Sequence, residues 1–281
     1  MKKRIFAFTM AIAVAISMMT GCSQQPDNNN DGQNVSDNVD NEENNSNKLD
    51  YEKIVVGLDD TFAPMGFRDE NGDLAGVDID LADAVSEVLE IPFELQPIDW
   101  TMKESELNNK NIDLIWNGYS ITDIRKEQVA FSEAYLKNKQ IVLVMANSDI
   151  NTLEDLSGKT VAVQDQSSAV AAIEKKPQIR DTFGNMVTFE TNDQCLRDLE
   201  AGRSDAVVAD EVLIRYYILQ KGEENYKILE EDFGDEEYAI GIRKGDTELL
   251  EAINSALKEI SENGKSKEIS EKWFGSDIIL K

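Results

Sequence analysis

The chain is predicted to be an α/β protein made of two similar lobes, because strand and helix patterns alternate twice along it. Short apolar runs bounded by turn residues are typical of buried strands. Between them lie segments whose apolar residues recur every three or four positions, as in helices. The 281 residues, 41% of them hydrophobic, are enough for two lobes of ordinary domain size. This order favours mostly parallel sheets with right-handed crossovers.

Residues 1–21 are predicted to be a signal peptide rather than part of a lobe. Three positive residues open the chain, and an uncharged, mostly apolar run follows at 5–19. That run is shorter than the roughly 20 residues that cross a bilayer and has the length of a secretory signal. It ends in Met-Thr-Gly followed by Cys22, which resembles a bacterial lipoprotein signal with a lipidated cysteine. An ordinary secretory signal followed by a chance cysteine is the alternative.

Residues 22–50 are expected to be the lipidated Cys22 and a disordered tether. They consist mainly of Asn, Asp, Glu, Ser and Gln, so they cannot bury enough apolar surface to offset the entropy of the chain. Two acyl chains or more give stable anchoring. The sequence therefore predicts an extracytoplasmic, lipid-anchored protein, either on the outer face of the cytoplasmic membrane or in a periplasm.

The composition excludes several classes of function. The chain has 28 Lys+Arg against 55 Asp+Glu, a formal net charge of -27, and no His. Nucleic acid is a poor partner because no basic surface is available to neutralise phosphates. Neither a Cys/His cluster nor a phosphate-binding glycine loop occurs, so no metal and no cofactor is expected. Cys195 falls in a helical pattern and is predicted to be a small buried residue rather than a nucleophile.

The folded part of the chain is expected to begin near Tyr51, and the first set of predicted elements follows from there. Strands are predicted at 53–58, 93–98 and 112–116, a helix from Asp78 to Pro92, and a short helix at 102–108. Residues 59–67 are expected to be a loop, and residues 69–73, with Asn-Gly at their centre, a turn.

The second set repeats this alternation. Strands are predicted at 141–145, 160–163, 186–189, 205–209 and 237–242. Helices are predicted at 152–156, from Ser167 onward, around Cys195, and after Asp210. A C-terminal helical segment carries apolar residues on one stripe from Leu249 to Ile260. The apolar strands at 141–145 and 237–242 are candidates for the connections between the two lobes.

Three separate segments of the first set follow directly after strands: residues 59–67, Trp100 and residues 117–125. In α/β sheets, ligands bind where the carboxyl ends of the strands meet the loops. These segments are therefore expected to meet at one edge of the sheet, with Arg125 as their only arginine.

Seven short segments then occur in the order found in the polar amino-acid-binding proteins of bacterial ABC importers, the solute-binding protein family 3. The sequence resembles this family across residues 53–278. The segments are 62–64, 76–81, 113–125, 131–135, 205–211, 241–246 and 272–275.

The resemblance implies a two-lobed Venus-flytrap fold of the periplasmic-binding-protein type II, with two connections between the lobes. Lobe 1 would comprise residues 51–139 and 236–281, and lobe 2 residues 140–235. A monomer of this kind closes over an amino acid by hinge motion and delivers it to a membrane permease driven by a cytoplasmic ATPase. The resemblance thus implies a binding protein rather than an enzyme.

An amino acid carries a carboxylate and an ammonium group, both of which need partners when they are buried. From the resemblance, Arg125 is expected to bind the carboxylate with two hydrogen bonds, and Asp210 to bind the ammonium group. The supporting contacts would come from Gly118, Ser120, Ser167 and Ser168, and Asn117, which replaces a smaller residue common in the family, would narrow the pocket. Gln166 stands where the family often has glycine, and Thr122 is expected to be a local cap rather than a ligand contact.

Side-chain recognition is assigned to the remaining candidates. Phe62 and Trp100 would sandwich the ligand, Asp59 and Gln164 would contact its side chain, and Asp78 would lie deeper. These residues fit glutamine, arginine, lysine, histidine or cystine. Two other functions stay open: a cyclohexadienyl or arogenate dehydratase-like enzyme of the same fold, and an amino-acid sensor that does not transport.

Overall fold

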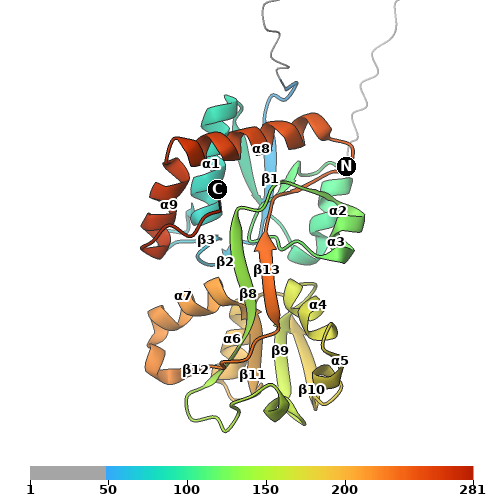
Figure 1. Cartoon of the computed structure of the whole chain (residues 1–281), viewed down its shortest axis with the longest axis vertical. Helices are drawn as coiled ribbons and strands as arrows, with labels where there is room; N and C mark the ends of the chain where they lie inside the picture. Colours follow the sequence, from blue (N-terminus) through green and yellow to red (C-terminus); the bar gives the residue numbers. More distant parts are fainter. Residues whose placement is uncertain (1–48, 281) are drawn as a thin grey trace, which may run out of the picture. The chain divides into compact units, whose positions relative to one another are not determined.

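A computed structural model describes residues 49–280 (Figure 1). The predicted signal peptide, Cys22 and nearly all of the predicted tether lie outside the described residues. Within the described part of the chain, no helix is long and apolar enough to cross a membrane.

The first lobe is built on a five-stranded sheet in the order β5-β1-β6-β14-β7. Strand β1 pairs in parallel with both β5 and β6, whereas β14 is antiparallel to β6 and β7. The predicted parallel arrangement therefore holds for the three N-terminal strands. The strands are β1 (Ile54–Leu58), β5 (Phe93–Pro97), β6 (Leu114–Ile115), β7 (Ala130–Phe131) and β14 (Gly241–Ile242).

Helix α1 (Val77–Leu89) begins where the chain passes very close to a neighbouring loop. Gly76 precedes it with φ +141°, and a Cβ at this position would lie 2.2 Å from the carbonyl oxygen of Met65. Only glycine fits this approach. The helix packs against α8 and α9. The other helices of this lobe are η1 (Trp100–Met102), α2 (Lys103–Asn108), α3 (Asp123–Gln128), α8 (Thr247–Glu262) and α9 (Lys265–Phe274).

The second lobe is built on a sheet in the order β10-β9-β11-β8-β12, and β13 pairs with β8. Its strands are β8 (Leu136–Met145), β9 (Thr160–Gln164), β10 (Asn185–Phe189), β11 (Ala206–Asp210), β12 (Tyr226–Ile228) and β13 (Gly234–Tyr238). Its helices are η2 (Glu154–Leu156), α4 (Ser168–Glu174), α5 (Pro177–Arg180), α6 (Asn192–Glu200), α7 (Glu211–Lys221) and η3 (Glu223–Asn225).

Both faces of this second sheet are covered by helices, which explains why its strands read as continuous apolar runs. On one face, Val161 and Val208 pack with Ile173 of α4. On the other, Ala162 and Val207 belong to the core that contains residues of α6 and α7. Cys195 on α6 is fully buried, and burial raises the pKa of its thiol to about 12. The prediction of a small buried residue is confirmed.

Strands β8 and β13 run side by side between the two sheets (Figure 1). Their antiparallel register joins Leu136 to Tyr238 and Gln140 to Gly234. The lobe boundaries expected at 139/140 and 235/236 fall inside this strand pair. Strand β8 starts five residues before the predicted 141–145 strand, at Leu136.

The prediction of one strand at 237–242 was wrong. The chain forms two strands there, β13 and β14, because its pairing partner changes between them. Up to Tyr238 it pairs with β8, and from Gly241 it pairs with β6 and β7. At the change, the Ala239 N–H donates to the carbonyl of Tyr119 and the Ile240 N–H to the hydroxyl of Ser132.

The predicted loop at 59–67 contains part of a small three-stranded sheet. Its strands are β2 (Thr61–Phe62), β3 (Gly66–Arg68) and β4 (Leu74–Ala75), with the predicted turn between the last two. Strands of two or three residues are too short to show a period of two. For the same reason, β7 and β12 were not predicted, and the helices α3 and α5, with six and four residues, are too short to show a helical period.

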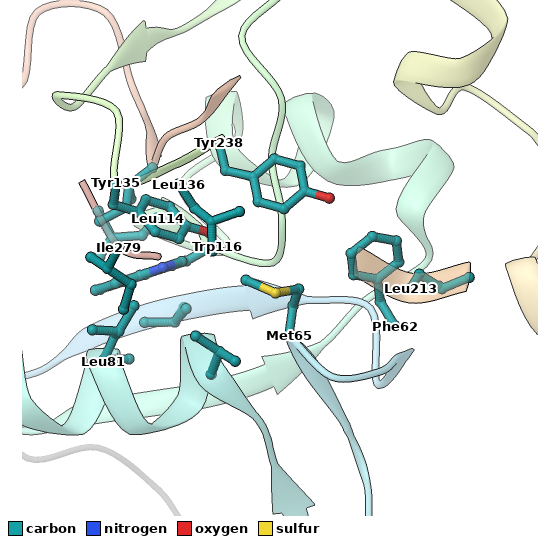
Figure 2. Packing of buried hydrophobic residues seen from close by; sticks show 14 of the residues in the cluster. Phe62, Met65, Leu81, Leu114, Trp116, Tyr135, Leu136, Leu213, Tyr238 and Ile279 are labelled. Atoms are coloured by element: carbon teal, nitrogen blue, oxygen red, sulfur yellow. The ribbon is translucent and has the colours of Figure 1, made fainter. Parts of the chain in front are cut away.

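The first-lobe core contains a row of aromatic rings that continues to the connecting strands. The rings of Trp116 and Tyr135 lie 6.2 Å apart between centroids, and those of Tyr135 and Tyr238 lie 6.3 Å apart. Figure 2 shows these residues in the same region as Met65 and Leu136. The aromatic row therefore fixes β8 and β13 firmly to the first lobe.

Candidate functional site

Ten of the twelve predicted ligand-binding residues line one cavity between the two lobes. The first lobe supplies six of them and the second lobe four. The cavity volume is about 10 Å³, room for roughly one water molecule, so the side chains close over the space. The ten are Asp59, Phe62, Trp100, Asn117, Gly118, Arg125, Gln164, Ser167, Ser168 and Asp210.

The other two predicted residues lie behind these. Ser120 is fully buried, and its Oγ lies 3.0 Å from the Oγ of Ser168 across the lobes. Asp78 is also buried, and its Oδ2 accepts a 2.7 Å hydrogen bond from the N–H of Gly118. Burial raises the pKa of Asp78 to about 7, and the bond from Gly118 opposes that rise.

Asp78 holds a tight loop at the end of β6. Gly118 has φ +54°, and a Cβ there would lie 2.6 Å from Cε1 of Phe62. A side chain at this position would therefore collide with one wall of the cavity. The hydrogen bond from Gly118 to Asp78 and the absence of a side chain together bring the loop backbone to the cavity.

Arg125 is held inside the site by helix α3. The Thr122 hydroxyl caps this helix by accepting from the Arg125 N–H at 3.2 Å, as predicted. The guanidinium lies over the Tyr119 ring, 4.4 Å from its centroid, and donates to the carbonyl of Ser120 at 2.8 Å. Its nearest carboxylate, on Glu104, is 3.9 Å from Nε. The guanidinium is therefore fixed in place and keeps N–H groups for an anion.

Gln166 adopts the left-handed conformation, φ +52°, at the position where the resemblance puts glycine. Its carbonyl accepts from Arg125 and from Lys103, both at 3.3 Å. Two first-lobe cations thus bond one second-lobe carbonyl. Burial, together with the charge of Arg125, lowers the pKa of Lys103 to about 8, whereas the neighbouring Glu104 opposes that change.

Asp59 forms a second direct contact between the lobes. Its Oδ1 accepts from the N–H and hydroxyl of Thr61, at 2.9 and 2.7 Å, and its Oδ2 accepts from Nε2 of Gln164 at 2.8 Å. Gln164 is oriented by Asn192, which donates to its Oε1, and by the carbonyl of Glu190. Burial raises the pKa of Asp59. Among the described residues, its hydrogen-bond donors are all uncharged.

Aromatic rings form the first-lobe wall. Phe62 and Trp100 are both buried. Trp100 meets Tyr119 edge-on, with centroids 6.0 Å apart, and the Lys103 ammonium lies 5.1 Å from the centroid of the Trp100 ring. These contacts hold the indole in place, so the wall is preformed.

On the second lobe, Asp210 ends β11 and precedes α7 without capping it. Its Oδ1 accepts from the hydroxyl of Tyr238 at 2.6 Å and from Nδ2 of Asn138 at 2.7 Å. Burial and the neighbouring Glu236 carboxylate raise its pKa well above the ordinary value. Ser167 does not cap α4 either, and its buried Oγ has no hydrogen-bond partner among the described residues. Both side chains face the cavity instead of closing a helix end.

Sequence reasoning missed a group of polar residues on the connecting strands. Asn138 and Gln140 on β8 are buried, and both donate to Glu236 of β13, at 2.6 and 2.8 Å. On each strand the polar residues lie two positions apart: Asn138 and Gln140 on β8, and Glu236 and Tyr238 on β13. Such spacing places side chains on one face of a strand, and this signal would have pointed to them.

The chain matches known proteins over most of its length. Residues 54–276 match the family of bacterial extracellular solute-binding proteins, family 3. The L-cystine-binding protein TcyJ of Escherichia coli (strain K12) is 30% identical over 227 residues, which cover 80% of this chain and 84% of that protein.

Solved structures of similar fold carry bound amino acids. One is an ABC uptake transporter substrate-binding protein from Streptococcus pneumoniae with bound histidine, 43% identical with a TM-score of 0.80, covering 82% of this chain and 95% of that one. Another is an ancestral arginine-binding protein bound to arginine, which is 39% identical with a TM-score of 0.75. The match covers 80% of this chain and 99% of that one. The protein described here thus belongs to the bacterial extracellular solute-binding proteins of family 3.

Proposed function

We propose that this protein is the amino-acid-binding component of an ABC importer, held outside the cytoplasm by a lipid on Cys22. The observation that carries the proposal is the cavity to which the first lobe contributes the guanidinium of Arg125 and the second lobe the carboxyl group of Asp210. A zwitterion placed between them would have each of its charges compensated.

In this proposal the ligand carboxylate binds the guanidinium of Arg125 and the hydroxyl of Ser167, while Ser168, whose hydroxyl faces Glu236, lines the cavity beside them. The ligand ammonium group binds Asp210. Ser167 supports this division because its hydroxyl is buried and finds no partner within residues 49–280, and such groups are costly unless something bonds them.

The ligand is proposed to be a basic amino acid. Once the carboxylate and ammonium groups are matched, Asp59 remains as a buried carboxylate with only neutral donors among the described residues. A cationic side chain lying between Phe62 and Trp100 would reach it and gain cation–π contacts. The matched structures that hold histidine and arginine agree with this class.

Closure is proposed to occur about the β8 and β13 pair, with residues 51–139 and 236–281 moving against residues 140–235. Contacts that join the lobes directly, such as Gln164 to Asp59 and Arg125 to Gln166, would then form on closing. The closed monomer would dock on a permease, whose ATPase supplies the energy.

A thermal-shift and calorimetry screen of the twenty amino acids and cystine tests the proposal. A ligand at 100 times its Kd should add about 2.7 kcal/mol to the free energy of unfolding. Arginine, lysine and histidine are expected to exceed glutamine and cystine. If no amino acid stabilises the protein, the proposal is wrong. Membrane fractionation of wild type and Cys22→Ser tests the anchor, because only the variant should be released.

A further inference from the structure

Glu236 lies where the two lobes and the connecting strands meet. Its Oε1 accepts hydrogen bonds from Asn138 at 2.6 Å, Gln140 at 2.8 Å and Ser120 at 2.8 Å, and it lies 3.4 Å from the Oγ of Ser168. These four residues come from the first lobe, the second lobe and strand β8. A single carboxylate oxygen thus gathers groups from every part that moves when the lobes close.

Glu236 stands behind the cavity rather than in its wall. Ser168 lines the cavity, and Ser120 bonds Ser168, whereas Glu236 lines a separate groove to which neither serine contributes. It can therefore act on a ligand only through the residues that it orients. The charged groups around the groove are Lys126, Lys137, Lys139, Glu211, Asp235 and Glu237.

Glu236 is also linked to Asp210. Nδ2 of Asn138 donates one hydrogen to each carboxylate, at 2.7 Å to Asp210 and 2.6 Å to Glu236. The remaining donors that the described residues give to these carboxylates are the neutral Tyr238, Gln140 and serine side chains. Two carboxylates that share one amide resist ionising together. In keeping with this, burial and the nearby Glu236 raise the pKa of Asp210.

We propose that Glu236 is a positioning residue that makes amino-acid binding proton-linked: it orients Ser120 and Ser168, and it keeps a proton on Asp210 until the ligand ammonium group displaces that proton into solvent. This inference rests on the proposed amino-acid binding. The O–H bond of the Asp210 carboxyl breaks and solvent water takes the proton, after which an N–H of the ligand ammonium group donates to the carboxylate that is left.

The sign of the effect follows from the charges. The ammonium group favours the ionised form of Asp210, so binding releases a proton, and affinity falls as pH falls. For one proton, Kd rises by up to tenfold per pH unit. The other charged groups lining or adjoining the cavity are Asp59, Asp78, Lys103 and Arg125, so the role of Glu236 must be isolated by comparing variants.

The test is calorimetry with L-arginine between pH 5 and 7, in pairs of buffers with different heats of ionisation, which counts protons released on binding. Glu236→Gln is expected to release fewer protons and to flatten the pH dependence of Kd. Glu237→Gln is the matched control, because it removes the same charge from the next residue of β13, which is exposed. It is expected to behave as wild type.

Two results would overturn the inference while leaving the proposed function intact: arginine binding to wild type without proton release, or Glu236→Gln retaining the wild-type proton count and pH profile. Failure of arginine and every other amino acid to bind would overturn the proposed function instead. Should Glu236→Gln not fold, Glu236→Ala, which also removes the charge, takes its place, and a wild-type proton count in that variant would overturn the inference.

Discussion

Gln164 of the second lobe donates its amide to the carboxylate of Asp59 on the first, at 2.8 Å. The amide cannot turn freely, because Asn192 bonds its oxygen and the carbonyl of Glu190 accepts its other hydrogen. Asp59 therefore has its position fixed from both lobes while its charge lacks a cationic partner among the described residues. On this ground we propose that Asp59 selects the ligand side chain.

Asp59→Asn is expected to weaken binding of arginine and lysine by about 10- to 100-fold, since a hydrogen bond to a charged group contributes about 1.5–3 kcal/mol. Glutamine should lose little, because an amide can still bond its side chain. Calorimetry with the three ligands measures the change. Asp60→Asn is the matched control, because Asp60 is the next residue along the chain and its carboxylate is paired with Arg68. An equal loss for all three ligands would contradict the assignment.

Arg125→Ala is expected to weaken the binding of every amino acid by at least about 30-fold. The substitution leaves the α-carboxylate, which all amino acids share, buried without its charged partner, a loss of about 2 kcal/mol or more. The ranking among ligands should persist. Lys126→Ala serves as the control, because Lys126 is the next residue along the chain and its exposed side chain is paired with Asp123. Unchanged affinity of Arg125→Ala in calorimetry would rule out the proposed contact.

The position of Arg125 and Asp210 was predictable because both follow strands of α/β sheets, and the ends of such strands meet at one edge. Their detailed partners were not. Arg125 bonds the carbonyl of Gln166, a contact that depends on a left-handed residue which no sequence pattern specifies. Glu236 was not predicted because β13 is mostly acidic, a composition typical of a solvent-exposed segment. Only the pairing of β13 with β8 places one face of the strand toward the interior.

The hairpin at 61–75 shows a different limit. Its strands have two or three residues each, so hydrophobic periodicity carries no information about them. What fixes the segment is tertiary structure: Gly76 admits the carbonyl of Met65, and Asp78 accepts from the N–H of Gly118 forty residues later. Local sequence patterns carry no information about contacts between residues so far apart in the chain.

Phe67 joins the lobes outside the cavity. Its ring in β3 lies 5.9 Å from that of Tyr216 in α7 and 5.9 Å, edge-on, from that of Trp273 in α9. Aromatic pairs contribute about 0.5–1.5 kcal/mol beyond their buried area. If the pair of Phe67 and Tyr216 forms when the lobes close, Phe67→Ala should weaken the binding of all ligands by about two- to tenfold without changing their ranking.

A double-mutant cycle on arginine affinity, with Phe67→Ala, Tyr216→Ala and both together, measures this contact directly. The double variant is expected to lose less affinity than the two single losses combined. Strict additivity would mean that the pair contributes nothing to closure, and a changed ligand ranking would mean that Phe67 acts on the site itself.

Asp78 predicts a dependence of stability on pH. Burial raises its pKa to about 7 in the folded protein, whereas the pKa in an unfolded chain is about 3.9. Between these values the folded state binds more protons than the unfolded state, so this group makes stability fall as pH rises from about 4 to 7 and adds no further change above pH 7. Each unit of difference corresponds to about 1.4 kcal/mol.

Urea unfolding of Asp78→Asn and wild type at pH 5 and 8 measures the effect. Asparagine keeps an oxygen for the N–H of Gly118 and cannot ionise, so the variant should gain stability relative to wild type at pH 8 and less at pH 5. Glu87→Gln, an exposed change on the same helix, is expected to show no such difference. A variant that is equally destabilised at both pH values would mean that Asp78 is ionised throughout, and that the bond from Gly118 outweighs the cost of burying the charge.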